Sequence, residues 1–324
     1  MAGLRFIDLF CGVGGFRWAL SELGHSCVFS CDNDPHAQET YALNFKETPH
    51  GDVKSLNAGD LPEHDVLCAG FPCQPFSISG KLQGFEDARG TLLHDVLRIA
   101  NFHKPKVLFL ENVKNFLGHD QGRTLVAAVE MMEDIGYHCH FSVLNASRFG
   151  VPQKRERIYF VCFRRDLRLD EFTFPETSDE DVALEEVLLP RDHAGLEDLF
   201  IHRADTFVSS DLPEERALRP LRVGTVGKGG QGERIYSIKG HAVTLSAFGG
   251  GVGAKTGLYL VDGKPRRLHP EECRRVMSFP DGFKLHPKPN VCYKQFGNSV
   301  AVKVVRMIFE QVESHLRGKA RLAA

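Results

Sequence analysis

The sequence predicts an α/β protein with a doubly wound, mostly parallel sheet and a small β-rich domain inserted into it. Two observations predict this class. Short apolar runs alternate with amphipathic stretches over the first 165 of the 324 residues, as in successive β-α-β units. The alternation then stops, and residues 222–253 hold ten glycines among threonine, valine, isoleucine and tyrosine. We therefore expect a large domain at 1–187 plus 298–324, a small domain at 188–269, and a connecting segment at 270–297.

Six apolar runs in the first half have the composition of core strands bounded by turn residues. They are LRFIDLF at 4–10, CVFSCD at 27–32, HDVLCAG at 64–70, KVLFLENV at 106–113, HCHFSVL at 138–144 and RIYFVCF at 157–163. Helical patterns lie between them at 16–23, 35–45, 91–103 and 124–135. In such a sheet, ligands bind beyond the carboxyl ends of the strands.

The second half shows two further patterns. RIYSI at 234–238 and HAVTLSAF at 241–248 alternate like strands, which indicates a small β-rich domain with glycine-supported loops. From residue 298 onward, Val304, Ile308, Val312 and Leu316 recur every four residues. This spacing predicts a long amphipathic helix that returns to the first domain.

Composition excludes several classes of protein. With 42% hydrophobic and 25% charged residues the chain is neither disordered nor collagen-like. No apolar run approaches the roughly 20 residues of a membrane span, and the N-terminus lacks the pattern of a signal peptide, so we expect a cytoplasmic protein without a membrane partner. The nine cysteines contain no C-x-x-C pair, which indicates reduced thiols and no metal site.

The charge of the chain is unevenly distributed. The net charge of −2 argues against a nucleic-acid partner, because binding to phosphates depends on Lys and Arg. However, residues 166–219 hold 16 acidic and 5 basic residues, whereas residues 220–275 hold 10 basic and 4 acidic ones. Such a swing marks either two differently exposed surfaces or a binding face for nucleic acid.

The first strand is followed by a glycine turn, FCGVGG at 10–15, which opens the first helix. Glycines at this place let a nucleotide-type ligand approach the backbone closely. Asp32 follows the second strand and Asp52 the next element, and an acid at such a tip suits ribose hydroxyls. These residues indicate an adenosine-containing cofactor, and by themselves they leave a dinucleotide and S-adenosylmethionine both open.

A second group lies at the same edge of the predicted sheet. Cys73 stands between Pro72 and Pro75 in the segment after the run at 64–70, where the prolines stiffen the backbone around a thiol. Glu111 ends the next strand. A nucleophile and a carboxyl acid would thus converge beyond adjacent strand ends, although a proline-rich turn with an incidental thiol explains the first segment equally well.

These motifs resemble, in order, those of the cytosine-5 DNA methyltransferases. They are FCGVGG at 10–15, GFPCQPFS at 70–77, ENV at 111–113, QKRER at 153–157 and GNSV at 297–300. The resemblance covers nearly the whole chain and implies a Rossmann-like, S-adenosylmethionine-dependent fold with an inserted target-recognition domain. VGKGGQGERIYS at 226–237 and TLSAFGGGVGAKTG at 244–257 most closely resemble members that modify the inner cytosine of GCGC.

The resemblance implies a mechanism and catalytic residues. The thiolate of Cys73 would add to C6 of a flipped-out cytosine, and Glu111 would hold a proton at N3. Arg155 and Arg157 would hold the base and its backbone, with Arg157 the better candidate for a base contact. No residue stands out as the base that removes the C5 proton.

The resemblance also assigns binding residues. The residues expected at S-adenosylmethionine are Phe10, Gly12, Gly14, Gly15, Asp32, Asn33, Asp52, Val53, Pro72 and Asn298. Those expected at double-stranded DNA are Ser77, Ser79, Arg89, Lys228, Gln231, Glu233, Arg234, Thr244 and Lys255. Gln231 and Ser79 would fill the space left by the flipped base, Arg234 would read guanine, and Arg89 and the two lysines would contact phosphates.

Two departures from the most similar members concern ligand contacts. Asp32-Asn33 replaces Glu-Trp, which keeps the acid and removes an aromatic wall for adenine, and Phe248 replaces a tyrosine. The resemblance further implies a monomeric bacterial modification enzyme with a restriction endonuclease that acts on the same site. The rival classes are an RNA cytosine-5 methyltransferase, a non-catalytic DNA-binding protein, and a dinucleotide-dependent oxidoreductase, which would leave the PCQ segment without a role.

Overall fold

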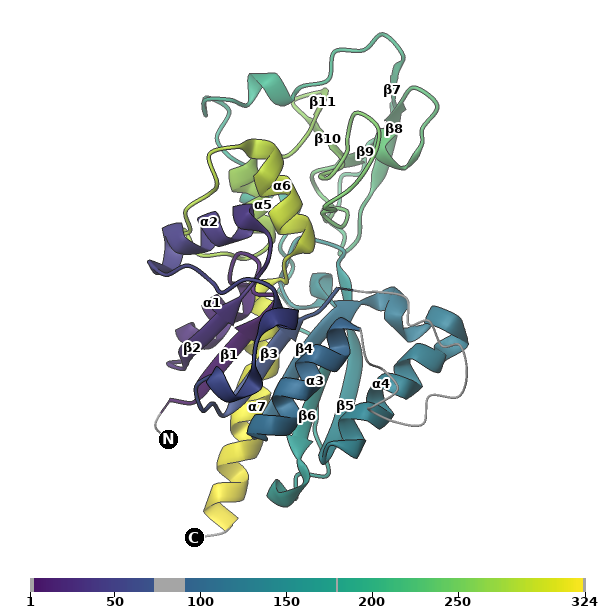
Figure 1. Cartoon of the computed structure of the whole chain (residues 1–324). Helices are drawn as coiled ribbons and strands as arrows, with labels where there is room; N and C mark the ends of the chain where they lie inside the picture. The colour runs from purple at the N-terminus through teal and green to yellow at the C-terminus, as the bar shows by residue number, and fades with distance from the viewer. Residues whose placement is uncertain (1–2, 73–90, 179, 323–324) are drawn as a thin grey trace. The chain divides into compact units, whose positions relative to one another are not determined.

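The computed structural model describes residues 3–72, 91–178 and 180–322 (Figure 1). The chain divides into two compact units. Unit 1 comprises Met1–Leu144, Glu156–Glu176 and Val305–Ala324, and unit 2 comprises Asn145–Arg155 and Thr177–Val304.

Unit 1 is built on a six-stranded sheet with the order β2-β1-β3-β4-β6-β5. The strands are β1 (Arg5–Leu9), β2 (Ser26–Cys31), β3 (Val66–Gly70), β4 (Val107–Val113), β5 (Tyr137–Asn145) and β6 (Glu156–Arg164). β1 pairs in parallel with β2 and β3, and β3 pairs in parallel with β4. β6 pairs with β4 in the antiparallel sense. All six predicted strands are thus present, in a sheet that is mixed at one edge.

Helices cover both faces of this sheet. They are α1 (Gly15–Glu22), α2 (Pro35–Phe45), α3 (Leu92–His103), α4 (Arg123–Asp134) and α7 (Val302–Leu322). Successive residues of β4 face opposite sides: Phe109 contacts the rings of Phe16 in α1 and Phe309 in α7, whereas Leu108 and Leu110 join the core beneath α3 and α4. Figure 1 shows α3 and α7 on opposite sides of the sheet. This alternation confirms the doubly wound α/β class.

Local sequence explains where the helices begin and end. Asp34 accepts hydrogen bonds from the backbone of His36 and Ala37 and precedes Pro35 at the first position of α2. Thr91 caps α3 in the same way through His94 N. The last helix begins at Val302 and not at residue 298, because α6 (Pro289–Asn298) ends there and Ser299 has an extended backbone.

Unit 2 contains a five-stranded sheet with the order β11-β10-β9-β8-β7. Its strands are β7 (Thr206–Val208), β8 (Arg222–Val226), β9 (Arg234–Ser237), β10 (Leu258–Val261) and β11 (Lys264–Arg266), and α5 (Pro270–Val276) and α6 follow. Only β9 and β10 pair in parallel. Val223, Val226, Ile235 and Leu258 form a small core. The segment predicted as a connector at 270–297 thus folds into two helices and their loop.

One predicted strand of unit 2 is wrong. Residues 241–248 form only an isolated bridge, in which Ala242 pairs with Gln153. Polar side chains take the hydrogen bonds that a strand ladder would use: Leu245 N donates to Gln153 Oε1, and Val243 N donates to the Tyr259 hydroxyl. The alternation of apolar residues at 241–248 therefore reflects alternate burial of an irregular segment.

None of the described helices combines the length and the apolar character that a membrane crossing requires.

Burial of His64 predicts a pH dependence of stability. Nδ1 of His64 lies 2.8 Å from the carbonyl oxygen of Pro62, and its ring lies 4.7 Å from that of His103. Burial lowers the pKa of His64 to about 4, with the neighbouring His103 contributing to the decrease. Because the unfolded chain binds this proton near pH 6.5 and the folded chain does not, His64 costs stability as pH falls from about 6.5 towards 4.

We expect His64→Asn, which keeps a donor and cannot titrate, to remove this dependence. Between pH 7 and pH 4.5 the wild type should lose about 2 to 3 kcal/mol more than the variant, as measured by urea unfolding. Other titrating groups are common to both proteins and cancel in the comparison. Equal losses would show that His64 is protonated in the folded state without penalty.

Candidate active site

The glycine turn after β1 has the backbone that its sequence predicts. Gly12 and Gly14 have φ of +54° and +83°, a region that favours glycine. A Cβ on Gly14 would lie 2.4 Å from the ring of Phe45, so packing of α2 also excludes a side chain there. A Cβ on Gly12 would meet no described atom within 4 Å. The turn therefore leaves open space beside Gly12, and Gly15 begins α1.

A cavity of about 250 Å³ lies next to this turn, within unit 1. Asp32 lines this cavity, and one of its carboxylate oxygens accepts from Gly12 N at 2.8 Å while the other accepts from Asp34 N at 2.8 Å. Asp52 also lines the cavity and caps the short helix η1 (Val53–Ser55) by accepting from Lys54 N at 3.0 Å. The lining residues are Phe10, Cys31, Asp32, Asn33, Gly51, Asp52, Val53, Lys54, Pro72 and Leu92.

Six of these ten residues are among those expected at the cofactor, and four were not singled out from sequence. Cys31, Gly51, Lys54 and Leu92 carry no motif of their own. Cys31, Gly51 and Lys54 each adjoin an expected residue, so adjacency along the chain was the available signal for these three, whereas Leu92 had none. Asn298 lies in unit 2, at the exposed end of α6.

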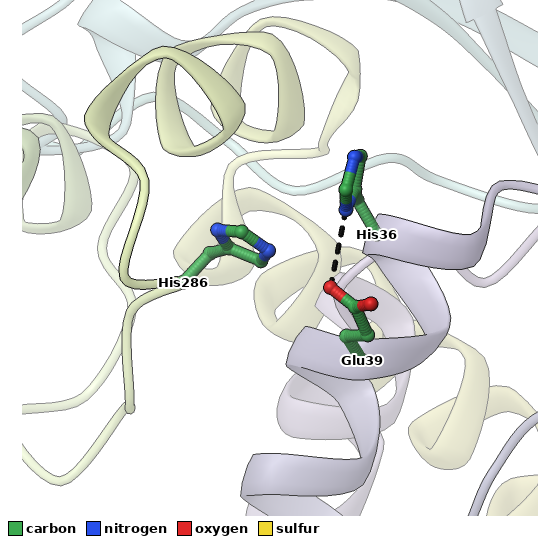
Figure 2. A group of neighbouring side chains, drawn as sticks. All are labelled: His36, Glu39 and His286. Atoms are coloured by element: carbon green, nitrogen blue, oxygen red, sulfur yellow. Dashed lines mark hydrogen bonds and ion pairs between the residues drawn. The ribbon is translucent and has the colours of Figure 1, made fainter.

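The helix that follows Asp32 carries an exposed ion pair. His36 Nδ1 and Glu39 Oε2 are 3.1 Å apart on the first turn of α2, as Figure 2 shows. Figure 2 also labels His286 of unit 2, whose Nδ1 accepts a hydrogen bond from Lys288 N at 3.0 Å. The pair on α2 is a surface contact that stabilises the helix by about 0.3 kcal/mol.

The ends of β3 and β4 meet beside the predicted nucleophile. Gly70 pairs with Glu111, and a Cβ on Gly70 would lie 3.5 Å from Glu111 Oε2. Asn112, which is buried, donates from Nδ2 to the carbonyl of Phe71 at 3.0 Å. The side chain of Asn112 thus fixes the chain two residues before Cys73. Cys73, Ser77, Ser79 and Arg89 themselves lie outside the described residues.

Glu111 and Arg157 form an ion pair at this edge of the sheet. Arg157 Nε lies 3.0 Å from Glu111 Oε1, and the side chains are only 13% and 10% exposed. They come from the neighbouring strands β4 and β6, 46 residues apart in sequence, where Val113 pairs with Arg157. The structure therefore brings together two of the four predicted catalytic side chains in a largely desolvated position.

Arg155 has a different environment, within unit 2. Its guanidinium donates to the backbone carbonyls of Leu245, Gly297 and Ser299, and the side chain is buried. These contacts join the GNSV segment to the chain after residue 241. These three bonds to the protein backbone indicate a positioning role for Arg155.

Gln153 is a residue that sequence reasoning missed. It is fully buried, and its amide contacts Leu245 N at 3.0 Å and the Met277 sulfur at 3.1 Å. The only signal was its place in QKRER, where the four charged residues drew attention. Gln153 supports the same segment that Arg155 holds.

The predicted DNA-contacting residues of unit 2 lie on or next to two loops that contact each other, one at 227–233 and one at 238–257. The loop 227–233 joins β8 to β9 and contains η10 (Gln231–Glu233), with Gly227 and Gly229 at positive φ. Gly253 N donates to Gly232 O at 2.8 Å, and a Cβ on Gly232 would lie 1.9 Å from Gly250 O. The glycines of the two loops are therefore required by the close approach of their backbones.

The side chains on these loops are largely free of the protein interior. Lys228, Gln231 and Arg234 are exposed. Glu233 accepts from Gly230 N at 2.9 Å and supports its own loop, whereas Thr244 donates to the carbonyl of Lys154 and Lys255 Nζ to that of Asn290 at 3.3 Å. The ring of Phe248, which departs from the family pattern, is 77% exposed.

The described cysteines are mostly unreactive. Burial raises the pKa of Cys27 and of Cys31 to about 12 and that of Cys292 to about 11. It also raises the pKa values of Cys11, Cys68, Cys162 and Cys273 well above the usual value of a thiol. A thiol that remains protonated is a poor nucleophile. These seven residues are therefore core thiols.

Asp8 is an ionisable group in the core of β1. It is fully buried, and its carboxylate oxygens have no hydrogen-bond partner among the described residues. Burial raises the pKa of Asp8 to about 8, although Arg17 opposes the shift. Asp8 is therefore mostly neutral at pH 7, which reduces the cost of burying it behind the glycine turn.

Comparison with known proteins identifies the family. The family model for C-5 cytosine-specific DNA methylases matches residues 4–314. The chain is 52% identical over 319 residues to the Type II methyltransferase M.HhaI of Haemophilus parahaemolyticus, covering 98% of this chain and 97% of that protein. It is 39% identical over 319 residues to the Type II methyltransferase M.MspI of a Moraxella species, covering 97% and 71%.

Solved structures show the same fold. The Dnmt2 methyltransferase of S. pombe superposes with a TM-score of 0.71 at 19% identity, covering 96% of this chain and 98% of that one. The methyltransferase EhMeth of Entamoeba histolytica gives a TM-score of 0.74 at 18% identity, covering 98% and 99%. Together with the family match over nearly the whole sequence, these likenesses show that the chain belongs to the C-5 cytosine-specific DNA methylase family and is a DNA (cytosine-5-)-methyltransferase.

Proposed function

We propose that the protein transfers a methyl group from S-adenosylmethionine to C5 of a cytosine flipped out of duplex DNA, through a covalent bond between Cys73 and C6. The observation that carries this proposal is the desolvated Glu111–Arg157 pair at the end of β4. It adjoins the strand that leads to Cys73, and Asn112 ties that strand's extension to β4. A nucleophile, an acid and a cation would thus serve one substrate ring.

The chemistry requires these groups because C5 of cytosine is a weak nucleophile in an aromatic ring. The Cys73 thiolate adds to C6, and the displaced electron pair spreads over C5 and N3. Glu111 holds a proton at N3, and Arg157 fixes the Glu111 carboxyl group and offers further donors to the base. S-adenosylmethionine supplies an electrophilic methyl group on its sulfonium sulfur. After C5 has taken the methyl group, a water molecule accepts the C5 proton, and the electron pair of the C5–H bond re-forms the C5–C6 double bond as the C6–S bond breaks. The Cys73 thiolate is thereby restored, and the proton at N3 returns to Glu111.

The pocket of unit 1 has the donor and acceptor groups that S-adenosylmethionine needs. Asp32, already oriented by Gly12 N, offers its remaining lone pairs to ribose hydroxyls. Asp52 accepts from the amine of adenine, the only donor on that base, while Val53 and Phe10 supply apolar contact. Gly12, with open space at its Cβ position, leaves room for the methionine part. Gly14, Gly15, Asn33 and Pro72 complete the proposed set in unit 1.

The loops of unit 2 support recognition of duplex DNA. Gln231 fills the space left by the flipped base, together with Ser79 from the segment outside the described residues. Flipping the base out of the duplex costs about 3 kcal/mol. Arg234 offers a bidentate pair to guanine, worth about 1 to 3 kcal/mol against a wrong base. Lys228, Lys255, Arg89 and Thr244 contact the backbone. We propose GCGC as the site, with its inner cytosine as target, and a role beside a restriction endonuclease that cuts the same sequence.

Transfer of radiolabelled methyl groups from S-adenosylmethionine to short duplexes tests this function. The panel contains GCGC, CGCG, GGCC and CCGG duplexes and a structured RNA. Label confined to GCGC would support the chemistry, the cofactor and the proposed roles of Gln231 and Arg234. Label on another duplex would overturn those two roles and keep the chemistry, whereas label on RNA alone would favour the RNA methyltransferase.

We expect Glu111→Gln to lower kcat by about 10²-fold, because an amide cannot hold a transferable proton at N3. Binding of duplex DNA should change little. Rapid-quench measurement of methyl transfer gives the rate, and Glu130→Gln, an exposed change on α4, is the control. A kcat within twofold of wild type would show that the ring is neutralised by another group.

A further inference from the structure

We propose that the cofactor pocket accepts S-adenosyl compounds whose adenine carries a bulky substituent on its exocyclic nitrogen. The inference rests on the proposed function, because it assumes that the pocket of unit 1 holds the adenosyl group. It follows from the unequal burial of the pocket's two sides.

One side of the pocket is closed. Cys31 and Val53 are 1% and 2% exposed, and both belong to the core cluster that also contains Ile7 and Leu9 of β1. Phe10 packs against the same core cluster and is half-buried. Because this wall is close-packed, a larger ligand cannot enlarge the pocket in this direction.

The other side is open. Asn33, Gly51 and Lys54 line the pocket and are all exposed. A Cβ built on Gly51 meets no described atom within 4 Å. Asn33 and Lys54 on this rim are polar and in contact with solvent. Among the residues that the structure describes, none therefore blocks a group that extends past Gly51.

The acceptor for the adenine amine lies at the open rim. Asp52 stands between Gly51 and Val53, and its Oδ1 accepts from Lys54 N at 3.0 Å. Its Oδ2 has no hydrogen-bond partner among the described residues, so it is available to a ligand donor. An adenine amine with one substituent keeps one N–H for this oxygen. Its substituent then extends between Gly51 and Lys54, away from the buried wall.

The geometry makes Asn33 and Gly51 the residues that determine this tolerance. A large ring at either position would occupy the open rim and exclude the substituent. The same ring would add apolar contact for unmodified adenine, which Asn33 does not provide. Asn33→Trp should therefore improve binding of the natural cofactor while it removes the tolerance.

Isothermal titration calorimetry with S-adenosylhomocysteine and its N6-benzyl derivative tests the proposal without catalysis. For the wild type we expect the two Kd values to agree within about fivefold, whereas Asn33→Trp should separate them by about 20-fold or more. Gly51→Phe is a second closing variant. Asn101→Trp, an exposed change on α3 outside the pocket, is the matched control and should behave as the wild type.

The outcomes separate this inference from the function on which it rests. If the wild type binds S-adenosylhomocysteine but rejects the N6-benzyl derivative by more than about 20-fold, the open rim is not used and the inference is overturned. Equal tolerance in wild type and in both closing variants would also overturn it. Failure to bind S-adenosylhomocysteine at all would contradict the cofactor assignment itself.

Discussion

Replacing Cys73 by serine is expected to abolish methyl transfer, by about 10⁴-fold or more, and to leave duplex binding intact. A serine hydroxyl has almost the shape of the thiol, but it stays protonated at neutral pH and is a much weaker nucleophile towards C6. Transfer is measured with radiolabelled S-adenosylmethionine, and duplex affinity by fluorescence anisotropy at a stated salt concentration.

Cys139→Ser is the matched control. Cys139 is half-buried in β5 and has no place in the proposed mechanism, so this variant should retain activity. Seven other described cysteines are held protonated by burial, which leaves no described thiol with an evident role as substitute nucleophile. Unchanged transfer by Cys73→Ser would exclude the covalent mechanism.

The same pair of measurements separates the rival roles. A non-catalytic DNA-binding protein would show duplex binding in both proteins and transfer in neither. Loss of transfer with preserved binding, in the variant alone, is expected only for an enzyme that uses the thiol.

The sequence predicts the strands of unit 1 well because each is a short apolar run between turn residues. It does not predict that β6 runs antiparallel to β4. A parallel crossover needs a dozen or more residues, usually with a helix, whereas only ten residues separate Asn145 from Glu156. The length of that connection was the available signal, and the apolar pattern alone does not contain it.

Residues 241–248 show more clearly what an alternating apolar pattern cannot predict. Their alternation is real, since His241, Leu245 and Ala247 in one register are buried while Thr244 and Phe248 in the other are exposed, but this burial comes without a strand ladder. The hydrogen bonds are made by Gln153 and Tyr259, side chains from distant parts of the sequence. A local pattern of apolar residues does not reveal hydrogen-bond partners that lie far away in the sequence.

The candidate site was predictable to the extent that motifs mark strand ends. Glu111 and Arg157 were both expected there, and their 3.0 Å contact depends on the pairing of β4 with β6. Arg155 and Arg157 are two residues apart and look equivalent in QKRER. They differ because β6 begins at Glu156, so that Arg155 precedes the strand and turns to the carbonyls of Leu245, Gly297 and Ser299.

Replacing Glu272 by alanine is expected to destabilise unit 2 by about 3 to 5 kcal/mol. Glu272 is fully buried and pairs with Arg266 through two hydrogen bonds of 2.7 Å. Its carboxylate also accepts from the backbone of His269 at 2.8 Å and of Leu189 at 2.9 Å. The variant would leave the buried Arg266 guanidinium without its counter-charge, and two backbone donors without partners.

Urea unfolding measures this loss, and two further variants identify its cause. Glu185→Ala removes part of an exposed pair with Arg216 in the same unit and should cost less than about 1 kcal/mol. The double variant Arg266→Met, Glu272→Leu removes both charges and should recover much of the stability lost by Glu272→Ala, because the isolated charge is the main cost. If the double variant is instead as unstable as Glu272→Ala, the bonds to Leu189 and His269 carry the stability, and the pair serves chiefly to hold those segments beside β11.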